Sequence, residues 1–313
     1  MDIIYIAIGL VLLVFGGDWL LKAAVAFSMQ LKIPKMVIGM TVVSFATSAP
    51  ELIVSLKSAL SGHPDLAIGN VIGSNIANLA MVLGVTILLS SIAVPRSFYK
   101  LDWPFMFIAS LLFFACIYFD GTIQSYEGVF LFLVLVGYLV YLLTNRNSSY
   151  EEEEEFTEPP ATFKSLGYML LGGLALWGGS EMLVYGAVSM AESFGVSQRI
   201  IGVTIVSIGT SIPELSASIV AVVKKEKTIS LGNLIGSNVF NILAVLGLTA
   251  AITPISVKDT GLLTNDIFWM LGISFAILPL SLLQQRKKGR QFGLLQGILL
   301  LVTYTAFVYQ LLY

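Results

Sequence analysis

The sequence predicts an all-α integral membrane protein of ten transmembrane helices, built as two inverted five-helix repeats with broken helices at the midplane. Composition is the first reason. Of 313 residues, 57% are hydrophobic and 12% are charged, whereas soluble domains are about half apolar and a quarter charged. The second reason is that ten apolar runs approach the roughly 17–25 residues needed to cross a bilayer. These runs are 2–21, 36–59, 67–90, 104–119, 127–144, 166–190, 199–223, 229–253, 265–283 and 292–311.

An internal repeat is the third reason. Residues 38–84 align without a gap to residues 201–247 at a constant offset of 163. Five spans in each repeat make the second copy enter the membrane from the opposite side, an arrangement typical of secondary transporters with a midplane site. We therefore divide the chain into a first repeat (1–144), an acidic cytoplasmic linker (145–163) and a second repeat (164–313).

The basic residues lie mostly on one side of this arrangement. When the ten spans alternate, thirteen of the 17 lysines and arginines face one side, and three, Lys57, Arg199 and Lys258, face the other. The positive-inside rule makes the richer side cytoplasmic. We therefore expect a multi-pass protein of the plasma or inner membrane with both termini extracytoplasmic.

Two related phrases, "SFATSAPELIVS" and "SIGTSIPELSAS", place a proline and a glutamate inside apolar spans. Pro50 and Pro213 free the carbonyls of the residues four positions earlier and predict a broken turn in each helix. In each phrase hydroxyls and one carboxylate recur at steps of three and four, so they share one helical face. Oxygen ligands without nitrogen or sulfur suit a hard cation such as Ca²⁺ or Na⁺. A carboxylate at this depth costs about 2.5–3.5 kcal/mol to insert and indicates function.

The third and eighth spans carry a second related pair, "GNVIGSNIAN" and "GNLIGSNVFN". Their glycines permit close helix packing. For Asn70, Asn75, Asn233 and Asn238, packing with amide bonds between helices and a role at a cation site both remain open.

The phrases "ATSAPE" with "GSNIAN", and "GTSIPE" with "GSNVFN", resemble the two alpha repeats of the cation/calcium antiporter superfamily, closest to prokaryotic sodium/calcium exchangers. The resemblance covers the whole chain. It implies an antiporter, not an enzyme, that exchanges Ca²⁺ for Na⁺ electrogenically by alternating access, without a cofactor. The residues it implies as ion ligands are Glu51, Glu214, Thr47, Ser48, Thr210, Ser211, Ser74, Ser237, Asn78 and Asn241, with the backbone oxygens of Ser44 and Ser207.

Two positions depart from that family pattern. Ala46 stands where glycine is common, which predicts a stiffer bend in the first repeat. Asn241 stands where potassium-dependent members carry aspartate, which favours exchange independent of K⁺. The expected partners are the transported cations and the lipid bilayer, with no nucleic acid, and the expected state is a monomer.

Other functions remain as alternatives. A proton-coupled antiporter for Ca²⁺ or another divalent cation is the nearest, because glutamates can also carry protons. An intramembrane enzyme with paired carboxylates needs partners in unlike environments, whereas these two phrases are near copies. A calcium channel is disfavoured by broken helices at a symmetry axis. Asp18 and Glu181 are interpreted as structural or interfacial, with Asp18 expected to pair with Lys22 one turn on.

Overall fold

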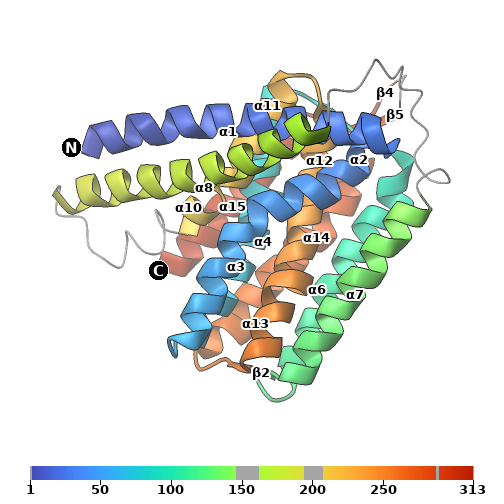
Figure 1. The fold of residues 1–313 in the computed structure, drawn as a ribbon. Coiled ribbons are helices and arrows are strands. Elements are labelled where there is room, and N and C mark those ends of the chain that lie inside the picture. The colour runs from blue at the N-terminus through green and yellow to red at the C-terminus, as the bar shows by residue number, and fades with distance from the viewer. Residues whose placement is uncertain (1, 146–161, 194–206, 287–288, 313) are drawn as a thin grey trace.

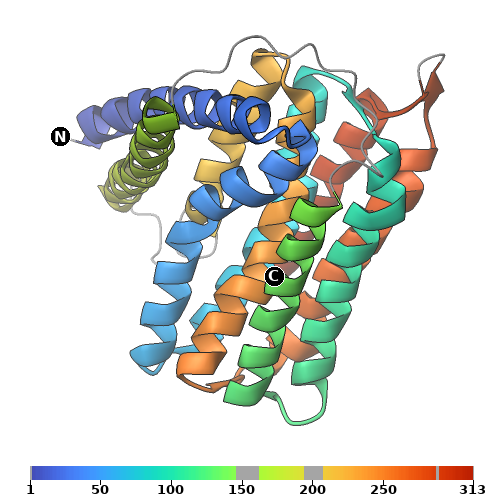
Figure 2. The same cartoon turned by 45° about the vertical axis from the view of Figure 1, so that its right-hand side comes forward.

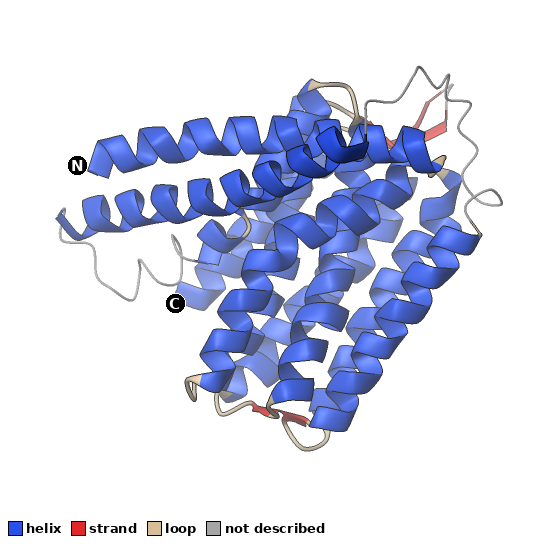
Figure 3. Ribbon diagram, in the orientation of Figure 1, coloured by secondary structure: helices blue, strands red, loops and turns tan. Residues whose placement is uncertain are grey.

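The computed structural model describes residues 2–145, 162–193, 207–286 and 289–312, and helices dominate it (Figures 1 and 3). The expected linker therefore lies almost entirely outside the described residues, as does the start of the seventh expected span. In the first half the helical elements are α1 (Asp2–Leu31), α2 (Lys35–Ile38), α3 (Ser44–Leu60), α4 (Pro64–Ile76), α5 (Leu83–Leu89), α6 (Trp103–Tyr118) and α7 (Ser125–Thr144), with π-helical stretches η1 (Gly39–Val43), η2 (Ala77–Val82) and η3 (Phe98–Asp102).

The second half follows a closely similar order. Its helical elements are α8 (Thr162–Ser193), α10 (Ser207–Thr210), α11 (Ile212–Val223), α12 (Lys227–Phe240), α13 (Gly247–Ile252), α14 (Ile267–Leu282) and α15 (Leu294–Leu312), with π-helical stretches η5 (Asn241–Leu246) and η6 (Leu262–Asp266). The stretches η2 and η5 interrupt equivalent helices at nearly the same offset, and η3 and η6 do likewise.

Within the described ranges, eight helical segments are long and apolar enough to cross a membrane. They correspond to the first five and the last three of the ten expected spans. The sixth expected span is covered by α8, and the described part of the seventh by α10 and α11. The fold is therefore a nearly all-helical membrane bundle.

Helices α1 and α8 form a pair that slants across the rest of the bundle (Figures 1 and 2). Glycines allow this close approach. A Cβ atom added to Gly16 would lie 2.8 Å from the backbone nitrogen of Leu176, and one on Gly172 would lie 2.7 Å from that of Leu20. Small residues bring membrane helices into backbone contact in this way. Helix α1 also packs against α11.

Short strands join the two halves at opposite ends of the bundle (Figure 3). At one end β1 (Ile92–Ala93) pairs antiparallel with β5 (Gly289–Phe292), which also pairs with β4 (Gln285–Arg286). At the other end β2 (Thr122–Ile123) pairs antiparallel with β3 (Ile255–Ser256). The β1–β5 and β2–β3 pairings each link one half of the chain to the other.

The two proline-bearing helices differ, which corrects the prediction that both are broken. Helix α3 continues through Pro50, although the segment from α2 to α3 changes direction along its length (Figure 1). In the second half the helix is interrupted at Ser211, which separates α10 from α11. A proline removes a single N–H donor, so flanking turns can persist with a bend. Ala46 favours the helix before Pro50, whereas Gly209, its counterpart, disfavours it by about 1 kcal/mol.

Candidate cation-binding site

Two glutamates from different halves of the chain meet inside the bundle. Glu51 on α3 and Glu214 on α11 are both 0% exposed, and their carboxyl groups lie close enough for their charges to repel each other. Neither carboxyl oxygen of Glu51 has a hydrogen-bond partner in the described structure, nor does Oε2 of Glu214. Two buried carboxylates repel each other, so the pair requires a cation or a proton between them.

Hydroxyl groups from the first half reach the carboxylate of the second half. Ser48 Oγ donates to Glu214 Oε1 at 3.2 Å, and the Glu214 carboxyl also faces the hydroxyls of Thr47 and Ser237. The Thr47 and Ser237 hydroxyl oxygens lie 3.3 Å apart. A hydroxyl that donates its proton to a carboxylate keeps its lone pairs for a cation.

The matching hydroxyls around the other half of the site are arranged differently. Ser74 Oγ on α4 lies 3.4 Å from Thr210 Oγ1 on α10, so this pair also joins the two halves. Ser211, the counterpart of Ser48, is 0% exposed, and its hydroxyl has no partner within the described ranges. An unpaired buried hydroxyl is costly unless a ligand satisfies it.

Amide side chains complete the set of oxygens. Asn78 on η2 and Asn241 on η5 are both 0% exposed. Neither the nitrogen nor the oxygen of the Asn78 amide has a partner among the described residues, and the same holds for the oxygen of Asn241. Native proteins leave few buried polar atoms unpaired, and η2 packs against α11 while η5 packs against α3, so these amides are candidates for a ligand site near the carboxylate pair.

The two serines expected to contribute backbone oxygens lie at equivalent places. Ser44 begins α3, and its hydroxyl donates to the backbone oxygens of Gly39 at 2.8 Å and of Asn233 at 3.0 Å. Its own backbone oxygen accepts from Thr47 Oγ1 at 3.4 Å. Ser207 is the first residue of α10, and its side chain lies outside the described part.

Close packing of α12 on the first half lets short side chains meet. Helix α12 packs against η1 and α3. A Cβ atom added to Gly236 would lie 2.6 Å from the Cα atom of Met40, so the backbones nearly touch there. Serine and threonine are short, and only such an approach allows Thr47 to contact Ser237.

One residue at this site was not singled out from the sequence. Ser180 on α8 donates to the backbone oxygen of Gly209 at 2.7 Å, the carbonyl that Pro213 was expected to free. The repeat could not reveal it, because the counterpart of Ser180 at the offset of 163 is Gly17, which has no hydroxyl. Its neighbour Glu181 is exposed.

Asp18 forms the expected ion pair with Lys22. Its carboxylate lies 2.7 Å from Lys22 Nζ and 3.0 Å from Lys224 Nζ. The pairing with Lys22 is confirmed, and the contact with Lys224 ties α1 to the end of α11. Asp18 and its two lysine partners therefore link α1 to α11 and are not part of the Glu51–Glu214 carboxylate pair.

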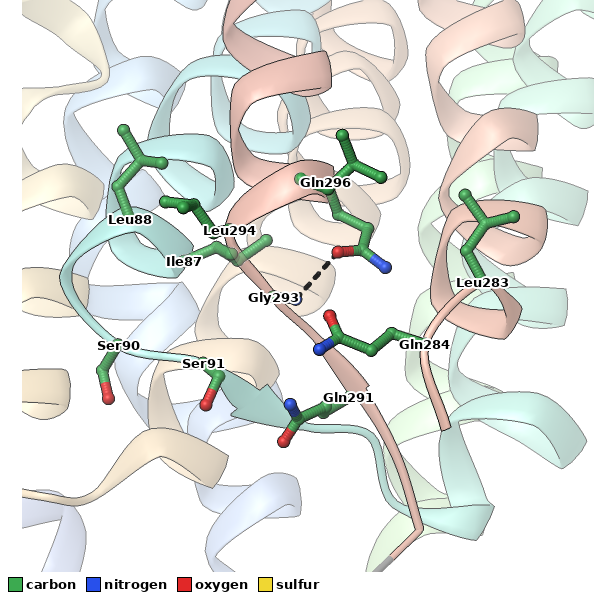
Figure 4. Close-up of a pocket in the computed structure, with 11 residues that line it drawn as sticks. Ile87, Leu88, Ser90, Ser91, Leu283, Gln284, Gln291, Gly293, Leu294 and Gln296 are labelled. Atoms are coloured by element: carbon green, nitrogen blue, oxygen red, sulfur yellow. Dashed lines mark hydrogen bonds between the residues drawn. The ribbon is translucent and has the colours of Figure 1, made fainter. Parts of the chain in front are cut away.

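An open pocket of about 580 Å³ lies away from the carboxylates, between α5, the end of α14 and the start of α15 (Figure 4). Its polar lining includes the amides of Gln284, Gln291 and Gln296, and Gln296 Oε1 accepts from the backbone nitrogen of Gly293 at 3.1 Å. No acidic side chain lines this pocket. Neutral amides do not balance the charge of a divalent cation, so the carboxylate pair is the better cation site.

The candidate ligands around the carboxylate pair all offer oxygen atoms. Among the residues that the structure describes, no group of three or more His, Cys, Asp or Glu side chains comes together. Two carboxylates with hydroxyl and amide oxygens suit hard cations and lack the nitrogen and sulfur ligands of most zinc or copper sites.

Known proteins of similar length resemble this chain over almost their whole sequences. The family model described as sodium/calcium exchanger protein matches residues 1–144 and 164–313. The chain is 37% identical to CaxA of Alkalimonas amylolytica over 98% of each protein. It is 30% identical to the sodium/calcium exchanger MaX1 of Methanosarcina acetivorans, over 100% of this chain and 99% of MaX1.

Solved structures of a sodium-calcium exchanger have the same fold as this chain. The sodium-calcium exchanger NCX_Mj, soaked with zero Na⁺ and Ca²⁺, superimposes with a TM-score of 0.83 at 27% identity, covering 99% of this chain and 98% of that one. The same exchanger soaked with Na⁺ and Sr²⁺ gives a TM-score of 0.82 at 28% identity.

The helical membrane bundle, the buried oxygen-rich site and these relatives define the class of protein as a cation/calcium antiporter, a transporter and not an enzyme. Within that class, the chain belongs to the sodium/calcium exchanger family.

Proposed function

We propose that the protein exchanges Ca²⁺ for Na⁺ across the membrane by alternating access. The observation that carries the proposal is the pair of fully buried carboxylates, Glu51 and Glu214, supplied by different halves of the chain. Together they match the charge of one Ca²⁺. The names of the relatives MaX1 and NCX_Mj support Na⁺ as the counter-ion.

The proposed ion ligands are the residues implied by the sequence resemblance. Unpaired buried oxygens on Glu51, Asn78, Ser211 and Asn241 support their inclusion. Several Na⁺ ions in exchange for one Ca²⁺ would move net positive charge, so the exchange is electrogenic. A neutral Asn241 in place of an aspartate leaves no third carboxylate for a potassium ion, so the exchange is independent of K⁺.

The burial of the site supports alternating access. Glu51 and Glu214 are 0% exposed, so ions cannot reach them from either side in this conformation. We propose two inverted repeats, residues 1–144 and 164–313, that rearrange around the site. In support, α3 runs toward the end of the bundle that carries β2 and β3, whereas α11 runs away from it (Figures 1 and 2).

The proposed topology has ten spans with both termini outside the cytoplasm, in the plasma or inner membrane, and a monomeric unit. The acidic segment 145–163 then lies on the cytoplasmic side. The excess of basic residues on that side supports this orientation.

The proposal is tested by measuring ⁴⁵Ca²⁺ uptake into proteoliposomes. Vesicles loaded with Na⁺ and diluted into Na⁺-free medium should accumulate Ca²⁺, and addition of K⁺ should not change the rate. We expect Glu51→Gln and Glu214→Gln each to lower uptake by at least about tenfold, because charge count sets the affinity of such sites. Glu181→Gln, a matched change at an exposed carboxylate, should transport like the wild type.

The same experiment distinguishes Na⁺-coupled exchange from the nearest alternative, a proton-coupled antiporter. Uptake driven by a pH gradient without Na⁺, and not by a Na⁺ gradient, would replace Na⁺ coupling with proton coupling. Full transport by both Glu51→Gln and Glu214→Gln would overturn the site itself.

A further inference from the structure

One buried asparagine outside the ion-ligand set contacts an asparagine within it. Asn75 on α4 is 1% exposed. Its Nδ2 atom donates to the backbone oxygen of Asn238 at 3.4 Å, and its Oδ1 atom accepts from Asn241 Nδ2 at 3.1 Å. The Asn75 amide therefore bridges two residues of the other half of the chain.

The chemistry of these contacts fixes the direction of both amides. A backbone oxygen can only accept, so the nitrogen of the Asn75 amide must face Asn238. The oxygen of Asn75 then faces Asn241, which must offer its nitrogen. Turning either amide over would place two acceptors or two donors together, so the chain of contacts has a single consistent arrangement.

This arrangement determines which atom of Asn241 remains available. With its nitrogen held by Asn75, Asn241 keeps its oxygen unpaired, and the residue is 0% exposed. Asn241 lies on η5, which packs against α3, the helix of Glu51. An amide oxygen is a ligand for a hard cation, whereas an amide nitrogen that bears two protons repels one.

The counterpart pair in the repeat lacks this connection. Asn238, which is equivalent to Asn75, donates instead to the backbone oxygen of Leu234 on its own helix at 2.7 Å. Its oxygen has no partner in the described structure, and neither does either polar atom of Asn78, the equivalent of Asn241. In the described structure no hydrogen bond fixes the amide of Asn78, while that of Asn241 is held by Asn75.

We propose that Asn75 is a positioning residue for the cation site: it holds the amide of Asn241 so that the Oδ1 atom, and not the nitrogen, faces the transported cation. The inference rests on the proposed function, because it assumes that Asn241 is an ion ligand. It makes the two halves of the site unequal, with an amide ligand oriented by a hydrogen bond in the second half and one without such a bond in the first.

A double-mutant cycle on Ca²⁺ affinity tests this role. Equilibrium binding of ⁴⁵Ca²⁺ to the purified full-length protein at fixed Na⁺ is measured for Asn75→Leu, Asn241→Ala and the double variant. Loss of a residue that orients a ligand typically weakens metal binding by about 10- to 100-fold, and we expect Asn75→Leu to raise the Kd at the lower end of that range. The double variant should bind within about twofold of Asn241→Ala alone, because Asn75 acts through Asn241.

The equivalent cycle in the other half is the matched control. Asn238→Leu and Asn78→Ala should have effects that multiply, since no hydrogen bond joins their side chains in the described structure. If Asn75→Leu does not yield folded protein, Asn75→Ala replaces it in the same cycle.

The outcomes separate the two proposals. Effects of Asn75→Leu and Asn241→Ala that multiply would mean that Asn75 only supports the fold, which would overturn its positioning role and leave the proposed function intact. A folded wild type that binds no Ca²⁺ would overturn the proposed function, and the role of Asn75 with it.

Discussion

At the scale of single residues, the proposed cation site depends on side chains that reach from one half of the chain into the other. Ser48 on α3 donates to Glu214 on α11, and Thr47 meets Ser237 on α12. Neither half alone encloses a carboxylate with its hydroxyl partners. The site therefore exists only when the halves are packed together.

Removing the Ser48 hydroxyl should weaken Ca²⁺ binding at the site without abolishing it. A hydrogen bond to a charged group contributes about 1.5–3 kcal/mol, so Ser48→Ala should raise the Ca²⁺ concentration for half-maximal uptake by roughly 10- to 100-fold. Ser61→Ala is the control, because Ser61 is exposed just beyond the end of the same helix. An unchanged half-maximal concentration for Ser48→Ala would exclude Ser48 from the site.

The residue types of the candidate site stand out in the sequence because they occur twice. What could not be predicted is how each copy is bonded. Ser48 has a carboxylate partner, but Ser211 has none in the described structure. Such differences arise from contacts between residues far apart in the chain, which an internal repeat does not encode.

At the scale of elements, the fate of each proline-bearing helix depends on the residues before the proline. Helix α3 continues through Pro50, whereas Ser211 interrupts the helix before Pro213. The sequence indicated a stiffer first bend through Ala46, but not an unbroken helix. The hydroxyl of Ser180 then satisfies the carbonyl of Gly209, which makes the interruption tolerable inside a membrane protein.

The contact between α1 and α8 makes a prediction about stability. A methyl group on Gly172 would collide with the backbone of Leu20, so Gly172→Ala should lower the free energy of unfolding by roughly 1–3 kcal/mol. Gly178 on the same helix has no atom within 4 Å of its added Cβ. There the change to alanine should be neutral or stabilising by up to about 1 kcal/mol through helix propensity.

Melting temperatures of the purified proteins in detergent check this contrast. Gly172→Ala should melt below the wild type and Gly178→Ala at or above it. Equal melting temperatures for the two variants would contradict the close backbone contact between α1 and α8.

At the scale of the whole molecule, the sequence identified the fold class through composition, apolar runs and the offset of 163. The membrane-length helices and the family are confirmed, while the full count of ten spans and the inverted orientation stay predictions. The short strands that join the halves, such as β1 with β5, were not predicted, because strands of two to four residues leave no detectable sequence pattern. The roles of Asn75 and Ser180 also required the packed structure.

The central claim is that one Ca²⁺ binds between Glu51 and Glu214 and that Na⁺ competes for the same site. Equilibrium ⁴⁵Ca²⁺ binding to the purified protein over a range of Na⁺ concentrations tests it most directly. The wild type should bind one Ca²⁺ per chain and lose it as Na⁺ rises, and Glu51→Gln and Glu214→Gln should each abolish this binding. Undiminished Ca²⁺ binding by either variant, or binding insensitive to Na⁺, would contradict the claim.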